Sequence, residues 1–258
     1  MSYAAPARSV LNRVASLAGK KNLAKSASKH KERQSRKRID RAHAKKPVPP
    51  EHARLPFVAP RMRIGILGGS FNPPHQGHLD ISMIALKRLG LDQVWWLVSR
   101  PNPLKDRKNV PSRKKRVAAA KGIARHPRIA VTGFDGVRRS VFTIDIIAEL
   151  TQRFPNVHFV WLMGADNLAD FHRWRAWQQL FELTPIVVFD RPGFRHKAIA
   201  SKAAQRYARF RKDESDARGI PLMEAPAWTL LGHPLSYISS TDLRAAERGR
   251  KKGAKARA

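Results

Sequence analysis

Two histidines stand three residues apart in a short segment that also holds a pair of glycines and a pair of prolines. The segment is residues 68–78, and its histidines are His75 and His78. Histidine side chains can donate hydrogen bonds to phosphoryl oxygens as negative charge builds up in a transition state. Adjacent glycines, here Gly68 and Gly69, allow a backbone to approach a bulky anion closely. These residue types together predict a phosphate-binding site.

The flanking sequence predicts where this segment lies in a fold. An apolar run, residues 64–67, comes before it, and a helical pattern that includes Leu79, Met83 and Leu86 comes after it. This order is typical of a buried strand, a tight turn and a helix. The free N–H groups and the positive dipole end at the start of a helix attract phosphate. We therefore expect both histidines near the first turn of the helix.

Other interpretations of the turn fit less well. No Gly-Lys-Ser/Thr follows the glycines, as a P-loop requires, and their spacing differs from the G-x-G-x-x-G of dinucleotide-binding folds. Two histidines three apart could share a metal ion, but no third ligand lies nearby in the sequence. The histidines could also merely cap the helix or pack in the turn. Two histidines, two glycines and two prolines within one turn favour phosphate binding.

Composition limits the classes of protein. The chain has 258 residues, 42% of them hydrophobic, which is enough for one domain with a substantial core and an appendage. There are no cysteines, which excludes disulfides and cysteine-based chemistry. No apolar run approaches the roughly 18 residues needed to span a bilayer. We therefore expect a soluble, cytoplasmic protein without membrane contact, either a monomer or a homo-oligomer.

The first sixty residues differ in character from the rest. Residues 20–41 form a basic run without an apolar stripe, and prolines punctuate residues 47–60. Such a segment cannot bury enough apolar area to offset its ordering entropy. We predict a disordered basic extension over residues 1–60 and a catalytic domain over residues 61–258. Met62 would be a natural start of the chain, and we hypothesise that the residues before it are dispensable for catalysis.

Two alternatives remain for this extension. A net charge of +32 would promote nonspecific contact with nucleic acid, so the extension could be a nucleic-acid arm. It could also be an organellar transit peptide, because it is rich in Arg, Ser and Ala and poor in acidic residues.

The remaining sequence alternates between strand-like and helix-like segments. Short apolar runs at residues 93–98, 129–131, 157–163 and 185–189 suit buried strands, and residues 112–125 and 143–153 read as helices. This order predicts an α/β fold with a doubly wound, mostly parallel sheet. Ligands bind such sheets at the carboxyl ends of strands, where the strand order reverses. The loops after the strands should therefore carry the other site residues.

Three of those loops hold candidates. Lys105 follows the second strand, Asp166 follows Gly164 after the fourth, and Arg191 follows the fifth. The lysine could be an ordinary surface residue, and the aspartate could simply cap a helix. Trp174 and Trp177 stand three apart, so we expect them on one side of a helix, one in the core and the other closing a pocket.

A second polar motif lies near the end of the chain. Its hydroxyls can cap a helix whose N–H groups face an anion, and Arg244 follows about one turn later. A guanidinium group suits a polyphosphate better than an ammonium group does. The motif begins at Ile238 and includes Ser239, Ser240 and Thr241.

The two motifs resemble the hallmarks of the nucleotidyltransferase superfamily of adenylyl- and cytidylyltransferases. The first hallmark, G-x-F-x-P-x-H-x-G-H, is filled by Gly69, Phe71, Pro73, His75, Gly77 and His78. Asn72 stands where many members carry Asp, at a position that the signature leaves open. The second hallmark, Ile-Ser-Ser-Thr-x-x-Arg, is residues 238–244. Within the superfamily the chain looks most like bacterial nicotinate-nucleotide adenylyltransferases, on the segments 102–105, 142–143, 164–166 with Trp174, and 191–193.

The resemblance implies a Rossmann-like fold and a reaction. AMP would pass from ATP to nicotinate mononucleotide, giving deamido-NAD and pyrophosphate in NAD biosynthesis. The mononucleotide's phosphate would attack the α-phosphorus directly, and Mg²⁺ would bind through ATP rather than through protein side chains. Both motifs would meet in one crevice around the triphosphate.

The resemblance also implies roles for individual residues. The catalytic residues would be His75, His78, Lys105 and Arg244. The ATP-binding residues would be Gly68, Gly69, Ser70, Phe71, His75, His78, Gly164, Asp166, Ile238, Ser239, Ser240, Thr241 and Arg244. The residues that bind the nicotinate nucleotide would be Ser70, Phe71, Lys105, Phe142, Thr143, Trp174 and Arg191.

Related and unrelated functions compete with this one. A nicotinamide-mononucleotide adenylyltransferase would share both hallmarks, and a pantetheine-phosphate adenylyltransferase or a cytidylyltransferase would share the superfamily. A basic nucleic-acid-binding protein would explain the charge without any chemistry. That class predicts aromatic side chains interleaved with Lys and Arg, whereas the basic extension offers only Tyr3 and Phe57.

Overall fold

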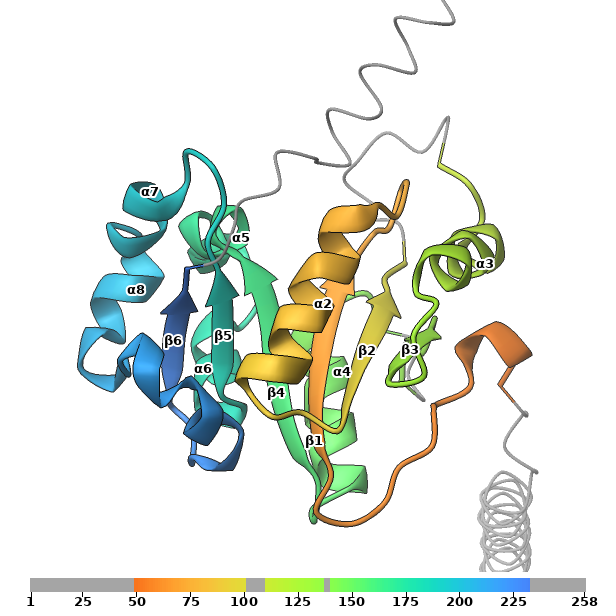
Figure 1. Cartoon of the computed structure of the whole chain (residues 1–258), viewed down its shortest axis with the longest axis horizontal. Coiled ribbons are helices and arrows are strands. Elements are labelled where there is room, and N and C mark those ends of the chain that lie inside the picture. Colours follow the sequence, from red (N-terminus) through yellow and green to blue (C-terminus); the bar gives the residue numbers. More distant parts are fainter. Residues whose placement is uncertain (1–48, 101–109, 137–139, 233–258) are drawn as a thin grey trace, which may run out of the picture. The chain divides into compact units, whose positions relative to one another are not determined.

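A parallel sheet of six strands forms the centre of the molecule (Figure 1). The computed structural model describes residues 49–100, 110–136 and 140–232. The order of the strands across the sheet is β3-β2-β1-β4-β5-β6. They are β1 (Arg63–Gly69), β2 (Gln93–Val98), β3 (Ile129–Thr132), β4 (His158–Gly164), β5 (Ile186–Phe189) and β6 (Trp228–Leu231).

The strand order reverses next to β1. This strand pairs with β2 on one side and with β4 on the other, and every pairing between named strands is parallel. The chain first adds strands toward β3 and then returns to add them toward β6, which leaves a switch point at the carboxyl ends of β1 and β4. The predicted doubly wound parallel sheet is therefore confirmed, and the histidine segment leaves the sheet at this point.

Helices cover both faces of the sheet. Figure 1 shows α2 (Gln76–Arg88) in front of the sheet and α4 (Thr143–Arg153) behind it. The helix α3 (Arg113–Ile123) and the 3₁₀ helix η4 (Glu214–Leu222) contribute to the same core as α2. The shorter helices α5 (Ala165–Ala169), α6 (Trp177–Leu183), α7 (Arg195–Ile199) and α8 (Lys202–Arg206) contribute to the core on the α4 side.

Alternation along the strands divides the apolar side chains between these two cores. In β2, Trp95 packs with the α4 core and Trp96 with the α2 core, because successive side chains of a strand point to opposite faces. Both indoles are buried, so they serve sheet packing. Ile66 lies between Trp95 and Trp161 of the neighbouring strands, which places three large side chains in one row.

The predicted helices and strands match the observed ranges closely, and several short elements were missed. The helix predicted at 143–153 is α4, and the strands predicted at 157–163 and 185–189 are β4 and β5, within one residue at each end. The strand β6 and the helices α7 and α8 were not predicted, and helices near Asp166 and Trp177 were expected without the bounds of α5 and α6. Each spans four to seven residues, too short for a hydrophobic period to stand out.

Residues 49–60 differ from the disordered segment that we predicted up to residue 60. The backbone of this stretch receives two hydrogen bonds from the end of β3, one from the Gly133 N–H to the His52 oxygen (2.7 Å) and one from Thr132 Oγ1 to the Arg54 oxygen (2.7 Å). Leu55 and Val58 pack against the α4 core. The packing of these apolar side chains explains why the packed part begins earlier. Residues 1–48 lie outside the described part, and the predicted two-domain division stays a prediction.

No helix in the described part of the chain is long and apolar enough to cross a membrane.

Candidate active site

The β1–α2 turn presents two imidazoles whose contacts differ. His75 is the N-cap of α2, and its backbone N–H donates to Nδ1 of His78 (3.2 Å). Because Nδ1 of His78 accepts this bond, the proton of the neutral ring is on Nε2. The Nε2–H of His78 is therefore a hydrogen-bond donor. Nδ1 of His75 is buried and has no partner among the described residues, so it can bind a ligand.

Burial keeps both imidazoles neutral. It lowers the pKa of His78 to about 3, with smaller contributions from His75 and from the charge of Arg191. Burial also lowers the pKa of His75, again assisted by Arg191 and opposed by Asp80. A neutral histidine donates a hydrogen bond without bringing a charge. Charge at this turn must come from another residue.

Aromatic stacking fixes the position of His78. The ring of Phe71 lies 4.6 Å from the His78 ring and is stacked on Trp96 at 5.1 Å. Phe71 is only 1% exposed and has a left-handed backbone (φ 46°), a conformation that costs energy for a non-glycine residue. We predicted Phe71 as a substrate-binding residue. Its side chain is buried beneath the histidine, so only its backbone is placed for that role.

An ion pair from two other strand ends faces the histidines. The Arg191 Nη1 in the loop after β5 donates to Asp166 Oδ2 in α5 (2.6 Å), while Asp166 Oδ1 is buried without a partner among the described residues. Asp190 shapes this loop by accepting from the Arg191 N–H (2.7 Å). The charge of Arg191 contributes to the lowered pKa values of both histidines. The structure thus brings together predicted residues from the ends of β1, β4 and β5.

Gly164, the last residue of β4, lies directly against the Asp166 carboxylate. A Cβ at Gly164 would lie 2.4 Å from Asp166 Oδ1. Any side chain there would displace the carboxylate that binds Arg191.

A second cluster gathers the residues predicted to receive nicotinate. Phe142 is the N-cap of α4, which begins at Thr143. The Arg175 guanidinium lies 4.4 Å from the centre of the Phe142 ring, so the segment that carries Trp174 lies beside the start of α4. Trp174 is half-buried and meets Trp161 edge to face at 6.2 Å.

One indole joins the two clusters. A Cβ at Gly68, in the phosphate turn, would lie 2.2 Å from Cη2 of Trp161, so the glycine lies directly on that ring. The same ring touches Trp174 of the second cluster. The predicted phosphate site and the predicted nicotinate site are therefore neighbours, with Trp161 between them.

The tryptophan pair differs from the prediction. Trp174 directly follows the 3₁₀ helix η2 (Phe171–Arg173), and Trp177 begins α6, so the two do not share a helix. Ala176 separates them with a left-handed backbone (φ 50°), which ends one helical segment and starts another. No sequence period could reveal a break of this kind, because alanine normally favours a continuous helix.

Part of the predicted site lies outside the described residues. These are Lys105 and the whole second motif, namely Ile238, Ser239, Ser240, Thr241 and Arg244. The expected meeting of the two motifs in one crevice stays a prediction.

Two residues near the site were missed in the sequence. Arg116 is buried beside the β1–α2 turn, and Asp135 accepts hydrogen bonds from Arg100 Nε (2.6 Å) and Arg113 Nη1 (2.8 Å). Arg116 was missed because it belongs to a basic run, residues 113–116, and such runs usually lie on an exposed surface. The available signal was its spacing of four from Ala120, which places both on the buried face of one helix.

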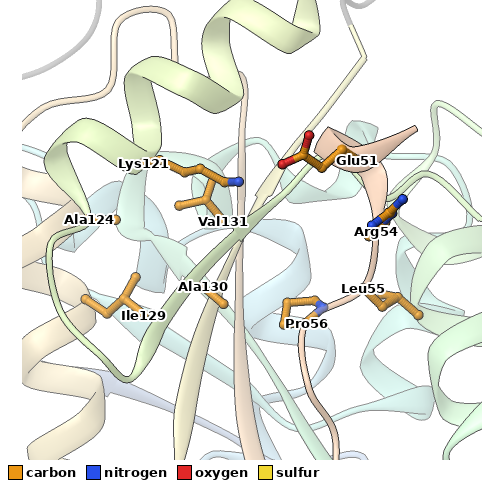
Figure 2. A pocket seen from close by; sticks show the side chains of 9 residues that line it. All are labelled: Glu51, Arg54, Leu55, Pro56, Lys121, Ala124, Ile129, Ala130 and Val131. Carbon is orange, nitrogen blue, oxygen red and sulfur yellow. The ribbon is translucent and has the colours of Figure 1, made fainter. Parts of the chain in front are cut away.

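The described residues contain no cluster of metal ligands, and the cavity that they form lies away from the predicted site. Within the described ranges, no group of three or more His, Asp or Glu side chains could hold a metal ion. A cavity of about 360 Å³ lies between residues 51–56 and the β3 edge (Figure 2). Lys121 and Glu51 line it together with apolar side chains, and none of the predicted site residues does.

Fold and site together define a nucleotide-binding α/β protein, and comparison with known proteins narrows the class. A cytidylyltransferase-like family profile matches residues 66–246. This chain belongs to the cytidylyltransferase-like family.

Comparison with individual relatives narrows the class further. A protein of Methylorubrum extorquens named "Probable nicotinate-nucleotide adenylyltransferase" is 51% identical over 183 residues, covering 71% of this chain and 99% of the relative. Relatives with the same name from Cereibacter sphaeroides (49% identical, 73% of this chain, 100% of the relative) and Rhizobium meliloti (45%, 73% and 100%) agree. The predicted resemblance to bacterial nicotinate-nucleotide adenylyltransferases is confirmed.

Solved structures share the fold. Plasmodium falciparum nicotinic acid mononucleotide adenylyltransferase complexed with NaAD has a TM-score of 0.53 and 20% identity, over 70% of this chain and 82% of that chain. The same enzyme complexed with APC has a TM-score of 0.53 and 19% identity, over 72% and 83% of the two chains.

Proposed function

We propose that this protein transfers the adenylyl group of ATP to nicotinate mononucleotide, forming deamido-NAD and releasing pyrophosphate. The relatives that share about half of its residues carry the name of this activity. The structural observation that supports it most directly is the neutral His78, whose Nε2–H is left to donate at the switch point of the sheet. A nucleotidyl transfer needs such donors where negative charge develops.

In the proposed reaction, a phosphate oxygen of the mononucleotide forms a bond to the α-phosphorus. The bond from that phosphorus to the bridging oxygen breaks, and pyrophosphate leaves with the electron pair. The protein supplies alignment and charge stabilisation rather than a nucleophile of its own. His78 donates from Nε2 to an oxygen of the transferred group, and His75 contacts a neighbouring phosphate through its unpartnered Nδ1.

We propose that the ion pair serves the ATP side of the site. The free Oδ1 of Asp166 would accept from a ribose hydroxyl, while Oδ2 stays bound to Arg191. The guanidinium would then supply positive charge beside the histidines. The family resemblance implies that Arg191 binds the nicotinate nucleotide, and its contact with Asp166 favours a place where both nucleotides meet.

The acceptor would bind in the second cluster. Thr143 offers a hydroxyl and a free N–H at the start of α4, and the ring of Trp174 can stack on nicotinate. The positive charge of Arg175, which lies over Phe142, favours a ring that carries a carboxylate.

Mg²⁺ fits the site through the substrate rather than through the protein. The described residues offer no set of three ligands, whereas a triphosphate supplies the oxygen ligands that Mg²⁺ prefers. When bound, the ion would neutralise charge on the leaving pyrophosphate. We further propose that Lys105 and Arg244 hold phosphates and that the protein works in the cytoplasm.

One assay tests the proposal. Purified protein with ATP and Mg²⁺ is offered nicotinate mononucleotide, nicotinamide mononucleotide and phosphopantetheine in separate reactions, and the adenylylated products are separated by chromatography. We expect the highest kcat/KM with nicotinate mononucleotide. A higher kcat/KM with either other acceptor would replace the substrate assignment, and no product with all three would overturn the enzyme itself.

A further inference from the structure

A buried arginine lies behind the β1–α2 turn. Arg116 is 2% exposed and belongs to α3, among the apolar side chains Val117 and Ala120. Its guanidinium donates to three backbone carbonyl oxygens, those of Ser70, of Ser99 (2.9 Å) and of Pro111 (3.1 Å).

No carboxylate pairs with this cation in the part of the chain that the structure describes. The ion pairs there involve other arginines, and burial, with the charge of Arg113 second, lowers the pKa of Arg116. Burying a charge against neutral acceptors alone is costly. An apolar residue would pack better at this position. The buried arginine therefore suggests a role other than packing.

Two of the three bonds join two strand ends. Ser70 follows β1 and Ser99 follows β2, and Arg116 holds the carbonyls of both. The Ser99 N–H also donates to the Gly69 oxygen (2.9 Å). The segments at the ends of β1 and β2 are therefore linked a second time, one residue before Ser70. Arg116 therefore fixes the backbone at the point where it leaves the sheet.

The planarity of the peptide bond extends this restraint to the next residue. In a trans peptide the C=O of Ser70 and the N–H of Phe71 point in opposite directions. Because the carbonyl is held against α3 by Arg116, the Phe71 N–H is directed away from α3. It donates to no acceptor among the described residues, although it lies in the same turn as the two histidines.

We propose that Arg116 is a positioning residue, which fixes the Ser70 carbonyl and thereby directs the Phe71 N–H toward the phosphates of the substrate. The inference rests on the proposed adenylyl transfer. It predicts that Arg116 affects turnover through the orientation of a backbone donor, although its own side chain never touches a substrate.

The experiment compares Arg116→Ala and Arg116→Lys with two controls on the same helix. Val117→Ala removes a buried side chain that contacts no carbonyl of the turn, and it controls for lost stability. Lys115→Ala removes an exposed cation and controls for lost charge. Kinetics are measured at a temperature where each variant is fully folded by circular dichroism.

We expect Arg116→Ala to lower kcat about 10- to 100-fold, because misplacing one donor has effects of that order. Both KM values should change less than about threefold. Guanidinium at millimolar concentration should restore part of kcat in Arg116→Ala by occupying the cavity, whereas ammonium at the same concentration should not. Arg116→Lys keeps the stem and the charge but not the three-way geometry, so it should fold and still lose turnover.

The outcomes separate the two proposals. If Arg116→Ala, or Arg116→Lys should the alanine variant not fold, loses no more kcat than Val117→Ala, the positioning role is overturned. Equal recovery with ammonium would also overturn it, since charge alone would then suffice. Absence of activity in the unaltered protein would instead overturn the proposed function.

Discussion

His78 combines two properties that favour catalysis at any physiological pH. Its pKa of about 3 keeps the ring uncharged, and the bond from His75 places the proton on Nε2. A donor that does not titrate near neutrality gives an activity that does not follow histidine protonation. The same burial of His78 lowers the stability of the folded protein at acidic pH.

The position of the donor can be tested with two isosteres. His78→Asn keeps an acceptor near the place of Nδ1 but loses the Nε2 donor, so we expect turnover to fall about 100- to 1000-fold. His78→Gln can put an amide N–H near the place of Nε2 and should lose less. Single-turnover rates with saturating ATP measure the difference, and equal losses in both variants would contradict a role for Nε2.

Stability should depend on pH through the same residue. In the folded protein the pKa of His78 lies below the ordinary value of about 6.5, so between pH 3 and 6.5 the unfolded chain binds the proton and the folded protein does not. The free energy of unfolding should therefore fall as pH falls through this window, by about 1.4 kcal/mol per pH unit for His78. Urea titrations of the unaltered protein and of His78→Gln at pH 5.0 to 7.5 would show the slope decrease by one proton in the variant.

At the scale of elements, the contact between β1 and β4 limits the phosphate turn. Gly68→Ala would place a Cβ 2.2 Å from the Trp161 ring. We expect about 1–3 kcal/mol of destabilisation, or more if the strands cannot shift. Trp161→Leu in the same chain should recover part of that loss, because the smaller side chain frees the space. A double-mutant cycle from denaturant unfolding measures this coupling, and strict additivity would show that the ring moves aside freely.

The packed segment before β1 gives a second test at this scale. A chain beginning at Met62 lacks Leu55 and Val58, which pack on the α4 core, and the hydrogen bonds to β3. We expect it to lose about 1–3 kcal/mol of stability while keeping kcat per folded molecule. A chain beginning at Pro49 should match the full chain in both. Loss of most turnover in the folded, shorter chain would refute the hypothesis that these residues are dispensable for catalysis.

Sequence patterns predicted the elements that are long or strongly apolar, and the reason is physical. The turn with His75 and His78 can be recognised in the sequence because its residue types are unusual together. The burial of the Phe71 side chain and of Arg116 was not foreseen for the opposite reason, since a phenylalanine in a motif and an arginine in a basic run look ordinary. Only the fold shows that one lies under His78 and the other behind Ser70.

The contact between Asp166 and Arg191 was also beyond the sequence. They lie twenty-five positions apart, and each follows the end of a different strand. Strand order alone brings their loops together, and the order could be inferred only as a class of topology.

At the scale of the whole molecule, the chain carries a net charge of +32, and both proposed substrates, ATP and nicotinate mononucleotide, are anions. A positive field raises the rate at which anionic substrates arrive, and salt screens it. We expect kcat/KM for ATP to fall about 3- to 10-fold between roughly 0.05 and 0.3 M KCl, with kcat nearly constant. Stopped-flow binding at both salt concentrations would assign the change to association. An unchanged kcat/KM would show that the charge serves another purpose.

All six tryptophans of the chain lie between residues 95 and 228, so its tryptophan emission originates wholly within the described fold. Trp174 touches Trp161, and excitation passes readily between indoles at such separations. An electron-poor pyridine ring stacked on Trp174 would quench both. Loading of the acceptor could then be followed in real time on the unlabelled protein, without any coupled enzyme.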